Sequence, residues 1–274
     1  MNFKNRILYQ LSKKTLEKNK RFHKIHSGKS CYIFGCGASL KYFDLKNFND
    51  KIAICCSSLF LHEDFKELNA KYYYMGHPFI FHKYWKNQYK KKYEKNLVGK
   101  LYRENINLNP QIEYFVSLSN YFAIRASNIN YVHHFDYLAS NPPKIQLDSI
   151  FSSMHGALNA MLGLALYMGF KNITLVGCDF TFKPKSQGHF FEFGKFANTN
   201  ENEIFSEDLL LFVKRQVNIE TITIDDSFIG DIINYTSYEE LTSSKPNYKE
   251  NNLIVSKQNL SNLNNFNMEY KIYK

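Results

Sequence analysis

A glycine-rich turn follows the first apolar run of the sequence and carries the residue types of a phosphate-binding loop. The run CYIFG (residues 31–35) leads into Gly35, Cys36 and Gly37, and Ser39 comes two residues later. Two glycines permit a sharp turn and a close approach to a ligand, and the amides that open the next helix attract phosphate. The third glycine of a dinucleotide fingerprint and the Gly-Lys-Ser/Thr end of a P-loop are missing. An ordinary strand-to-helix turn therefore stays open as the alternative.

A second set of polar residues lies at the end of a later apolar run and in the irregular stretch after it. Asp179 follows the run NITLVG (residues 172–177), and GHFFE places His189 and Glu192 farther along. In open α/β sheets ligands bind beyond the carboxyl ends of the strands, so Asp179 is expected either to contact a ligand or to cap a loop. A histidine beside glycine on a closing loop suits a general base, which Glu192 would orient. A surface histidine without a role is the alternative.

Other histidines are candidates for the same crevice. His155 and Gly156 begin a long apolar helix, whose positive end favours a neutral imidazole, and His77 follows the third apolar run. Both histidines also fit a packing or capping role. The adjacent His133 and His134 would point to opposite faces of a strand, so they seldom bind one ion. We expect no metal.

These candidates require parallel strands that end at one edge. Apolar runs alternate with helix-length segments, which predicts an α/β fold with a Rossmann-like, mostly parallel, doubly wound sheet. The expected strands are residues 31–35, 51–56, 71–75, 172–177 and 221–225, with weaker candidates at 112–116 and 130–135.

One helix and one lid complete the expected domain. A helix that is apolar nearly all round lies between Gly156 and Phe170, with Ser152 or Ser153 as the N-cap and Gly169 as the C-cap. A lid is expected at about 181–205, as an insertion after the Gly-Cys-Asp-Phe strand. The predicted organisation is a basic N-terminal helix at 1–27, the sheet domain at 28–242 and a loosely ordered tail at 243–274, with one strand around 253–255.

Composition sets the class of protein. The chain has 274 residues, 44% of them hydrophobic and 22% charged, which is typical of a globular protein. The five cysteines are odd in number and form no Cys-x-x-Cys pair, which indicates a reducing cytosol. The sequence shows neither a secretion signal nor an apolar stretch long enough to cross a bilayer. We expect a cytoplasmic protein that is soluble or peripheral at the inner face of the cytoplasmic membrane.

Positive charge is concentrated in two segments. Residues 1–30 hold nine Lys/Arg and one acid, and residues 83–103 hold eight and one, so the two segments carry +8 and +7. Because the net charge of the chain is +10, the remainder carries about −5. Ile7, Leu8, Leu11 and Leu16 recur at helical spacing among the first set, as in a helix lying on an anionic membrane. A solvated helix packed on the domain is the alternative. The second set, with Trp85, Tyr89 and Tyr93, could form a basic amphipathic helix. Nucleic acid is not an expected partner, because no recognised nucleic-acid module is present.

Taken in order, several motifs resemble those of the bacterial sialyltransferases that act on lipooligosaccharides. They are IFGCGASLKYFDL, CSSLFLHEDF, SMHGALNAMLGLALYMGFKNITLVGCDF and GHFFEFGK, and the resemblance covers roughly residues 28–225. The chain is also similar, above all in Gly-Cys-Asp-Phe, to the flagellin-modifying motility accessory factors and related proteins of unassigned function. In the sialyltransferase family a CMP-linked nonulosonic acid binds across the carboxyl edge of a Rossmann-like sheet, and a histidine deprotonates the acceptor hydroxyl for inverting transfer.

The resemblance implies a role for each candidate residue. It implies that Gly35, Cys36, Gly37 and Ser39 hold the phosphate, that Ser57 contacts nucleotide or sugar, and that His155 and Gly156 meet the cytidine or ribose. It further implies that Asp179 closes the floor of the pocket, that His77 and Thr181 lie near substrate, and that His189 is the base. Four motif positions differ from the family, at Cys36, Ser57, 154–156 and Thr181. The donor sugar therefore stays open among sialic, legionaminic, pseudaminic and Kdo-type acids.

The hypothesis is a glycosyltransferase that moves such a sugar from a CMP donor to a cell-surface glycan or glycolipid, without a cofactor. Two alternatives stay open. One is a nucleotide-dependent pyrophosphokinase or hydrolase on the same fold, and the other is a non-catalytic, membrane-associated binding protein. The oligomeric state is open as well, with a homo-oligomer as one option.

Overall fold

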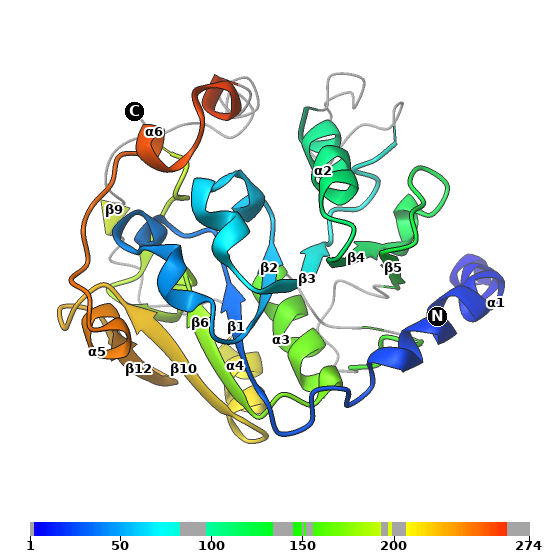
Figure 1. Cartoon of the computed structure of the whole chain (residues 1–274). Coiled ribbons are helices and arrows are strands. Elements are labelled where there is room, and N and C mark those ends of the chain that lie inside the picture. Colours follow the sequence, from blue (N-terminus) through cyan, green and yellow to red (C-terminus); the bar gives the residue numbers. More distant parts are fainter. Residues whose placement is uncertain are drawn as a thin grey trace. The chain divides into compact units, whose positions relative to one another are not determined.

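The computed structural model of the chain divides into two compact units, each built from two stretches of sequence (Figure 1). The first unit comprises Met1–Gly28 and Lys71–Phe170, and the second comprises Lys29–Ala70 and Lys171–Lys274. The structure describes residues 3–82, 97–133, 145–149, 151, 156–192, 197–198 and 207–261. The expected body at 28–242 therefore contributes to both units, which we describe one at a time.

The second unit contains parallel strands in the order β12-β10-β6-β1-β2. Their bounds are β1 Ser30–Phe34, β2 Ile52–Cys56, β6 Asn172–Val176, β10 Asn218–Thr223 and β12 Asn234–Ser237. Four of these confirm expected runs, and β12 is an addition. The short runs in β1, β2 and β6 are buried at four of their five positions, as strands covered on both faces must be.

Helices and short strands flank this sheet. The 3₁₀ helices are η2 Ala38–Tyr42, η3 Leu45–Phe48, η4 Leu59–Leu61, η5 Glu63–Glu67 and η8 Asp179–Thr181. The α-helices are α4 Glu207–Lys214, α5 Tyr238–Thr242 and α6 Asn251–Ile254. Two antiparallel pairs complete the unit, β7 Phe182–Lys183 with β11 Ile229–Gly230, and β8 Ser186–Gln187 with β9 Ala197–Asn198. The α5 helix follows β12 directly (Figure 1), and a capping box between Ser237 and Glu240 starts it.

Among its described residues, the first unit contains three parallel strands in the order β3-β4-β5. Their bounds are β3 Ala70–Met75, β4 Glu113–Ser117 and β5 Ile129–Val132, which confirm the other three expected runs. The helices are α1 Phe3–Glu17, η1 Lys18–Phe22, α2 Leu97–Leu108, η7 Leu118–Asn120 and α3 Ala157–Met168. Both units thus have the α/β class that the sequence predicts, with a mostly parallel pairing of strands.

The apolar helix α3 confirms one expected cap and corrects the other. Gly169 ends the helix in the left-handed conformation at φ 84°, where it satisfies carbonyls of the last turn. The N-cap is Gly156 at φ 82°, rather than Ser152 or Ser153, which lie outside the described residues. A positive φ disfavours serine at the position that the chain uses to enter the helix.

The segment after α5 differs from the loose tail that its composition suggests. The amides of Asn247 and Lys249 donate to the carbonyls of Tyr42 and Lys41 at 3.0 and 2.8 Å, so the described part, up to Ser261, packs on the second unit. The strand expected at 253–255 is wrong: residues 251–254 form α6, and only Val255 makes a bridge, to His62. Low overall hydrophobicity concealed a segment that is held by backbone hydrogen bonds and by the buried side chains of Asn251, Ile254 and Val255.

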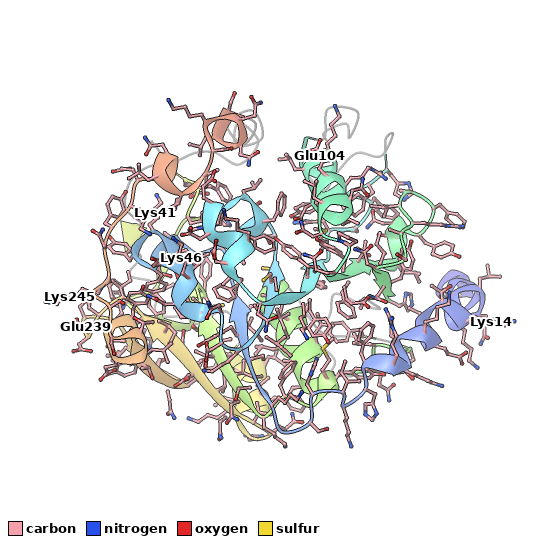
Figure 2. All side chains as sticks on the ribbon, viewed as in Figure 1. Lys14, Lys41, Lys46, Glu104, Glu239 and Lys245 are labelled. Carbon is pink, nitrogen blue, oxygen red and sulfur yellow. The ribbon has the colours of Figure 1, made fainter. Side chains whose placement is uncertain are left out.

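The basic N-terminal segment is helical. In α1, Leu16 is fully buried while Leu11 is 79% exposed, beside the exposed Lys13 and Lys14 (Figure 2). Most of the second basic segment, with Trp85, Tyr89 and Tyr93, lies outside the described residues. Among the helices that the structure describes, none has the length and apolar character of a membrane span.

Candidate functional site

The glycine-rich turn continues the pairing of β1 with β6 beyond both strands. The amides of Gly35 and Gly37 donate to the carbonyls of Val176 and Gly177, both at 2.8 Å. A β-carbon on Gly35 would lie 2.3 Å from the Gly177 oxygen, and one on Gly37 would lie 2.4 Å from Cγ of Asp179. The two glycines are therefore required for the contact between the turn and the end of β6.

Asp179 fills the position at which the sequence predicts a phosphate. Its carboxylate accepts the backbone N–H of Ser39 at 2.9 Å and the Ser39 hydroxyl at 2.5 Å, and it also takes a hydrogen bond from the Ala38 amide. The side chain is 1% exposed. The amides that open η2 thus bind a carboxylate of the same chain, in the way that helix N-termini bind anions.

Burial perturbs this carboxyl group. Desolvation raises the pKa of Asp179 to about 6, against the hydrogen bonds from Ser39 and the positive charge of His189, which act to lower it. The turn after β1 and the start of η2 both contact this carboxyl group of η8. A change in its protonation state therefore changes the hydrogen bonds that hold the turn.

The GHFFE segment packs on the same turn. The amide of Phe190 donates to the carbonyl of Cys36 at 3.1 Å, and His189 forms an isolated antiparallel bridge with Gly37. Gly188, at φ 110°, supplies a backbone conformation that few other residues adopt. The expected neighbourhood of the first turn and the later histidine is therefore present within the second unit.

His189 and Glu192 form a side-chain pair. Nδ1 of His189 lies 2.9 Å from Oε1 of Glu192, and the imidazole stacks on the ring of Phe191 at a centroid distance of 5.0 Å. The histidine side chain is 52% exposed. Burial, the largest influence, raises the pKa of Glu192, but the contact with His189 and the charge of Lys41 outweigh it and hold the pKa below its usual range. An ionised Glu192 holds the proton on Nδ1, which leaves Nε2 as the basic nitrogen.

Two side chains that sequence reasoning missed hold the backbone of this loop. The buried Lys41 on η2 (Figure 2) donates through Nζ to the carbonyl of Glu192, and Nδ2 of Asn251 donates to the carbonyl of Phe191 at 3.0 Å. Burial lowers the pKa of Lys41, whereas Glu250 and Glu192 raise it. No local pattern marks either residue, since a lysine after a turn and an asparagine in a polar segment are both typical of exposed positions.

The resemblance implies that Cys36, Ser57 and Thr181 contact the ligands, and the structure gives each of them a buried or half-buried position. Cys36 is buried, and its thiol donates to the carbonyl of Cys56 at 3.4 Å. Thr181 is also buried; its hydroxyl donates to the Cys178 carbonyl at 2.7 Å and lies 2.9 Å from the hydroxyl of Thr221. The Thr181 hydroxyl is thus paired within the protein, and the substrate contact that the resemblance implies stays a prediction. Ser57 is half-buried and holds φ at 52°, an uncommon value for a residue with a side chain.

The remaining candidates belong to the first unit or lie outside the described residues. His77 is exposed after β3, where its carbonyl accepts Nδ2 of Asn120 at 3.0 Å, and Gly156 is the N-cap of α3. His155 and His134 lie outside the described residues. Within the described ranges no group of three or more metal-ligating side chains is present.

Comparison with known proteins gave one structural match to report. The sequence matches no family model and none of the curated proteins. Among solved structures, the chain is similar to the sialyltransferase CstII from Campylobacter jejuni, solved in complex with a substrate analogue, cytidine-5'-monophosphate. The identity is 13% and the TM-score 0.37, over 87% of this chain and 98% of that one.

The elevated pKa of Asp179 predicts a pH dependence of stability. The folded chain holds this proton more tightly than the unfolded chain, so the contribution is fully present below about pH 4 and is lost, by about 3 kcal/mol in total, as the pH rises through about 6. Asp179→Asn keeps a partner for both groups of Ser39 and should remove this decline. Asp179→Ala also lacks the titrating group, so its stability should not show this decline either, and its two unpaired Ser39 groups should make it about 2–4 kcal/mol less stable than Asp179→Asn at any pH. Urea unfolding between pH 4 and 7 measures both, with the exposed Asp226→Asn as the control. An undiminished slope in Asp179→Asn would refute the assignment.

The contact of Asn251 with the loop gives a second prediction. Asn251→Ala should lower the free energy of unfolding by about 1–2 kcal/mol, because the carbonyl of Phe191 loses its donor in a buried position. Asn252 is the matched control, since it is the next residue of α6 and is exposed, and its alanine variant should change stability by less than about 0.5 kcal/mol. Equal urea midpoints for the two variants would show that the contact does not stabilise the loop.

Proposed function

We propose that this protein is an inverting glycosyltransferase that moves a sialic acid-like or Kdo-type sugar from a CMP donor to a glycan or glycolipid hydroxyl. The observation that carries the proposal is the His189–Glu192 pair, held against the glycine-rich turn at the carboxyl end of a parallel sheet. A half-exposed imidazole with its Nδ1 fixed by a carboxylate is suited to general-base catalysis on a ligand at that edge.

In the proposed reaction, Nε2 of His189 accepts the proton of the acceptor hydroxyl as its oxygen attacks the anomeric carbon of the donor. The bond from that carbon to the phosphate oxygen breaks, and CMP leaves from the opposite face. Glu192 stabilises the imidazolium that forms, through the contact at Nδ1. No cofactor takes part, since the donor is itself a substrate.

The donor phosphate needs a binding position other than the Ser39 amide, which Asp179 occupies. We place the nucleotide beside the turn that follows β2, at Ser57. A serine held at φ 52° costs free energy, and strained residues of this kind cluster at ligand sites.

The occupied amides also favour a second candidate. If Asp179 permanently replaces a phosphate, the protein is a binding protein without transferase activity. A nucleotide-dependent pyrophosphokinase or hydrolase on the same fold would instead bind ATP or GTP. All three candidates differ in the nucleotides that they bind.

The test is a thermal-shift panel of CMP, CDP, UDP, GDP, GTP and ATP at one protein concentration, followed by His189→Ala. CMP at about 100 times its Kd should raise Tm by about 5 °C, and the other nucleotides should do less. His189→Ala should retain that shift and lose transfer by a factor of about 100 or more. The exposed His23→Ala is the control and should retain both. Stabilisation by ATP or GTP alone would favour the pyrophosphokinase or hydrolase, stabilisation by no nucleotide would favour the binding protein, and either result would reject our proposal.

A glycolipid acceptor would bring the protein to the inner face of the cytoplasmic membrane. We propose that α1 contacts anionic headgroups there, because Leu11 is exposed beside Lys13 and Lys14.

Lys14→Glu should weaken binding to phosphatidylglycerol vesicles about tenfold, at roughly 1 kcal/mol per lysine near the surface. Lys245→Glu alters an exposed lysine of the second unit and should leave binding unchanged (Figure 2). Vesicle co-sedimentation measures both, and equal binding by the two variants would exclude α1 as the contact.

A further inference from the structure

Three thiols gather at the carboxyl ends of adjacent strands in the second unit. Cys36 follows β1, Cys56 ends β2 and Cys178 follows β6. The thiol of Cys56 donates to the carbonyl of Phe34 at 3.5 Å, and that of Cys178 donates to the carbonyl of Ile33 at 3.8 Å. All five cysteines lie in the described part of the chain, and none of them forms a disulfide.

Cys36 and Cys56 have the separation of a pair that can be oxidised. Their strands are neighbours in parallel register, with Ile33 opposite Ile54. Continued by two residues, this register puts Cys56 opposite Gly35, so Cys36 lies one residue past that position. A spacing of about 4.8 Å between strands and about 3.3 Å along a strand separates the Cα atoms of such a pair by about 6 Å, which a disulfide spans. The Cys36 sulfur lies 3.4 Å from the carbonyl oxygen of Cys56, and the two thiols share a hydrogen bond.

The two sulfurs differ in their ease of ionisation. Hydrogen bonds from Cys36 and from Ser57 lower the pKa of Cys56 although burial opposes them. The same hydrogen bond, together with burial, raises the pKa of Cys36. Burial raises the pKa of Cys55 and of Cys178. Cys56 is thus the group that forms a thiolate most readily, and the thiolate is the form that reacts with oxidants.

We propose that Cys36 and Cys56 form an oxidation site that reacts with hydrogen peroxide or a small organic hydroperoxide. The Cys56 thiolate attacks a peroxide oxygen, the O–O bond breaks, and water or an alcohol leaves with one proton, which gives the sulfenic acid of Cys56. The sulfur of Cys36 then attacks that sulfur, the S–O bond breaks, and a second water leaves with the thiol proton. One disulfide forms, the two thiols lose two electrons, and the peroxide gains them.

A disulfide between Cys36 and Cys56 would affect the candidate site through backbone contacts of Cys36. The carbonyl of Cys36 accepts the amide of Phe190 at 3.1 Å, and the next residue, Gly37, pairs with His189. A disulfide at Cys36 redirects its side chain and so alters the backbone that supports His189. This consequence for transfer rests on the proposed function, whereas the oxidation itself does not.

The test treats the full chain with hydrogen peroxide, quenches it, and counts free thiols after denaturation. The count should fall from five, as the sequence has, to three, and dithiothreitol should restore it. The single variants Cys36→Ser and Cys56→Ser should each prevent the cross-link. Cys31→Ser and Cys55→Ser are matched controls, which should keep it, because trypsin leaves Cys31 with Cys36 and Cys55 with Cys56 on the same peptides.

The free-thiol count of the wild-type protein tests the proposal even where a variant fails to fold. A count that stays at five, a cross-link that survives in Cys36→Ser, or a loss of thiol that dithiothreitol does not reverse would each overturn the proposal. Binding of CMP before and after oxidation is a separate measurement. It reports on the nucleotide site and leaves the thiol result unaffected.

Discussion

The buried carboxylate of Asp179 makes the hydrogen bonds on which the rest of the candidate site in the second unit depends. It holds the amide and hydroxyl of Ser39, and through them it holds the start of η2 against the end of β6. Gly37 must lack a side chain so that this carboxylate can approach. A charge in this environment is costly, as the raised pKa indicates, and the hydrogen bonds from the turn compensate it.

The loop that bears His189 depends on the same turn. It pairs with Gly37 and Cys36 on one side, and its carbonyls receive Lys41 and Asn251 on the other. Glycine at 188 supplies the backbone turn, and side chains distant in sequence fix the position of the loop. The imidazole is therefore half-exposed on a backbone that is fixed at several points. This combination of an exposed reactive group and a supported backbone is what a general base requires.

Much of the fold follows from local pattern. Short apolar runs identified seven of the parallel strands, because a strand buried on both faces has few alternatives. The division into two units was not predicted, since each unit combines stretches that are distant in the sequence. Likewise the 243–261 segment has a polar composition but is held by backbone hydrogen bonds, which composition does not report.

The candidate site was predictable in part. The order of the motifs identified four candidate site residues, Gly35, Gly37, Asp179 and His189, and the structure places them close together in the second unit. The hydrogen-bond partner of each group was harder to predict. The anion that binds Ser39 is the carboxylate of Asp179 in the same chain, and Thr181 pairs with Thr221. Partners of this kind depend on long-range packing, which spacing along the sequence does not encode.

The most direct test of the central claim is the imidazole NMR spectrum of the protein during titration with CMP. Histidine labelling resolves His189 in the second unit and His23 in the first as separate probes. The account predicts that CMP shifts the His189 resonances, that Glu192→Gln alters this response, and that His23 stays unchanged. A titration in which CMP leaves His189 unmoved, while the protein is folded, would contradict it.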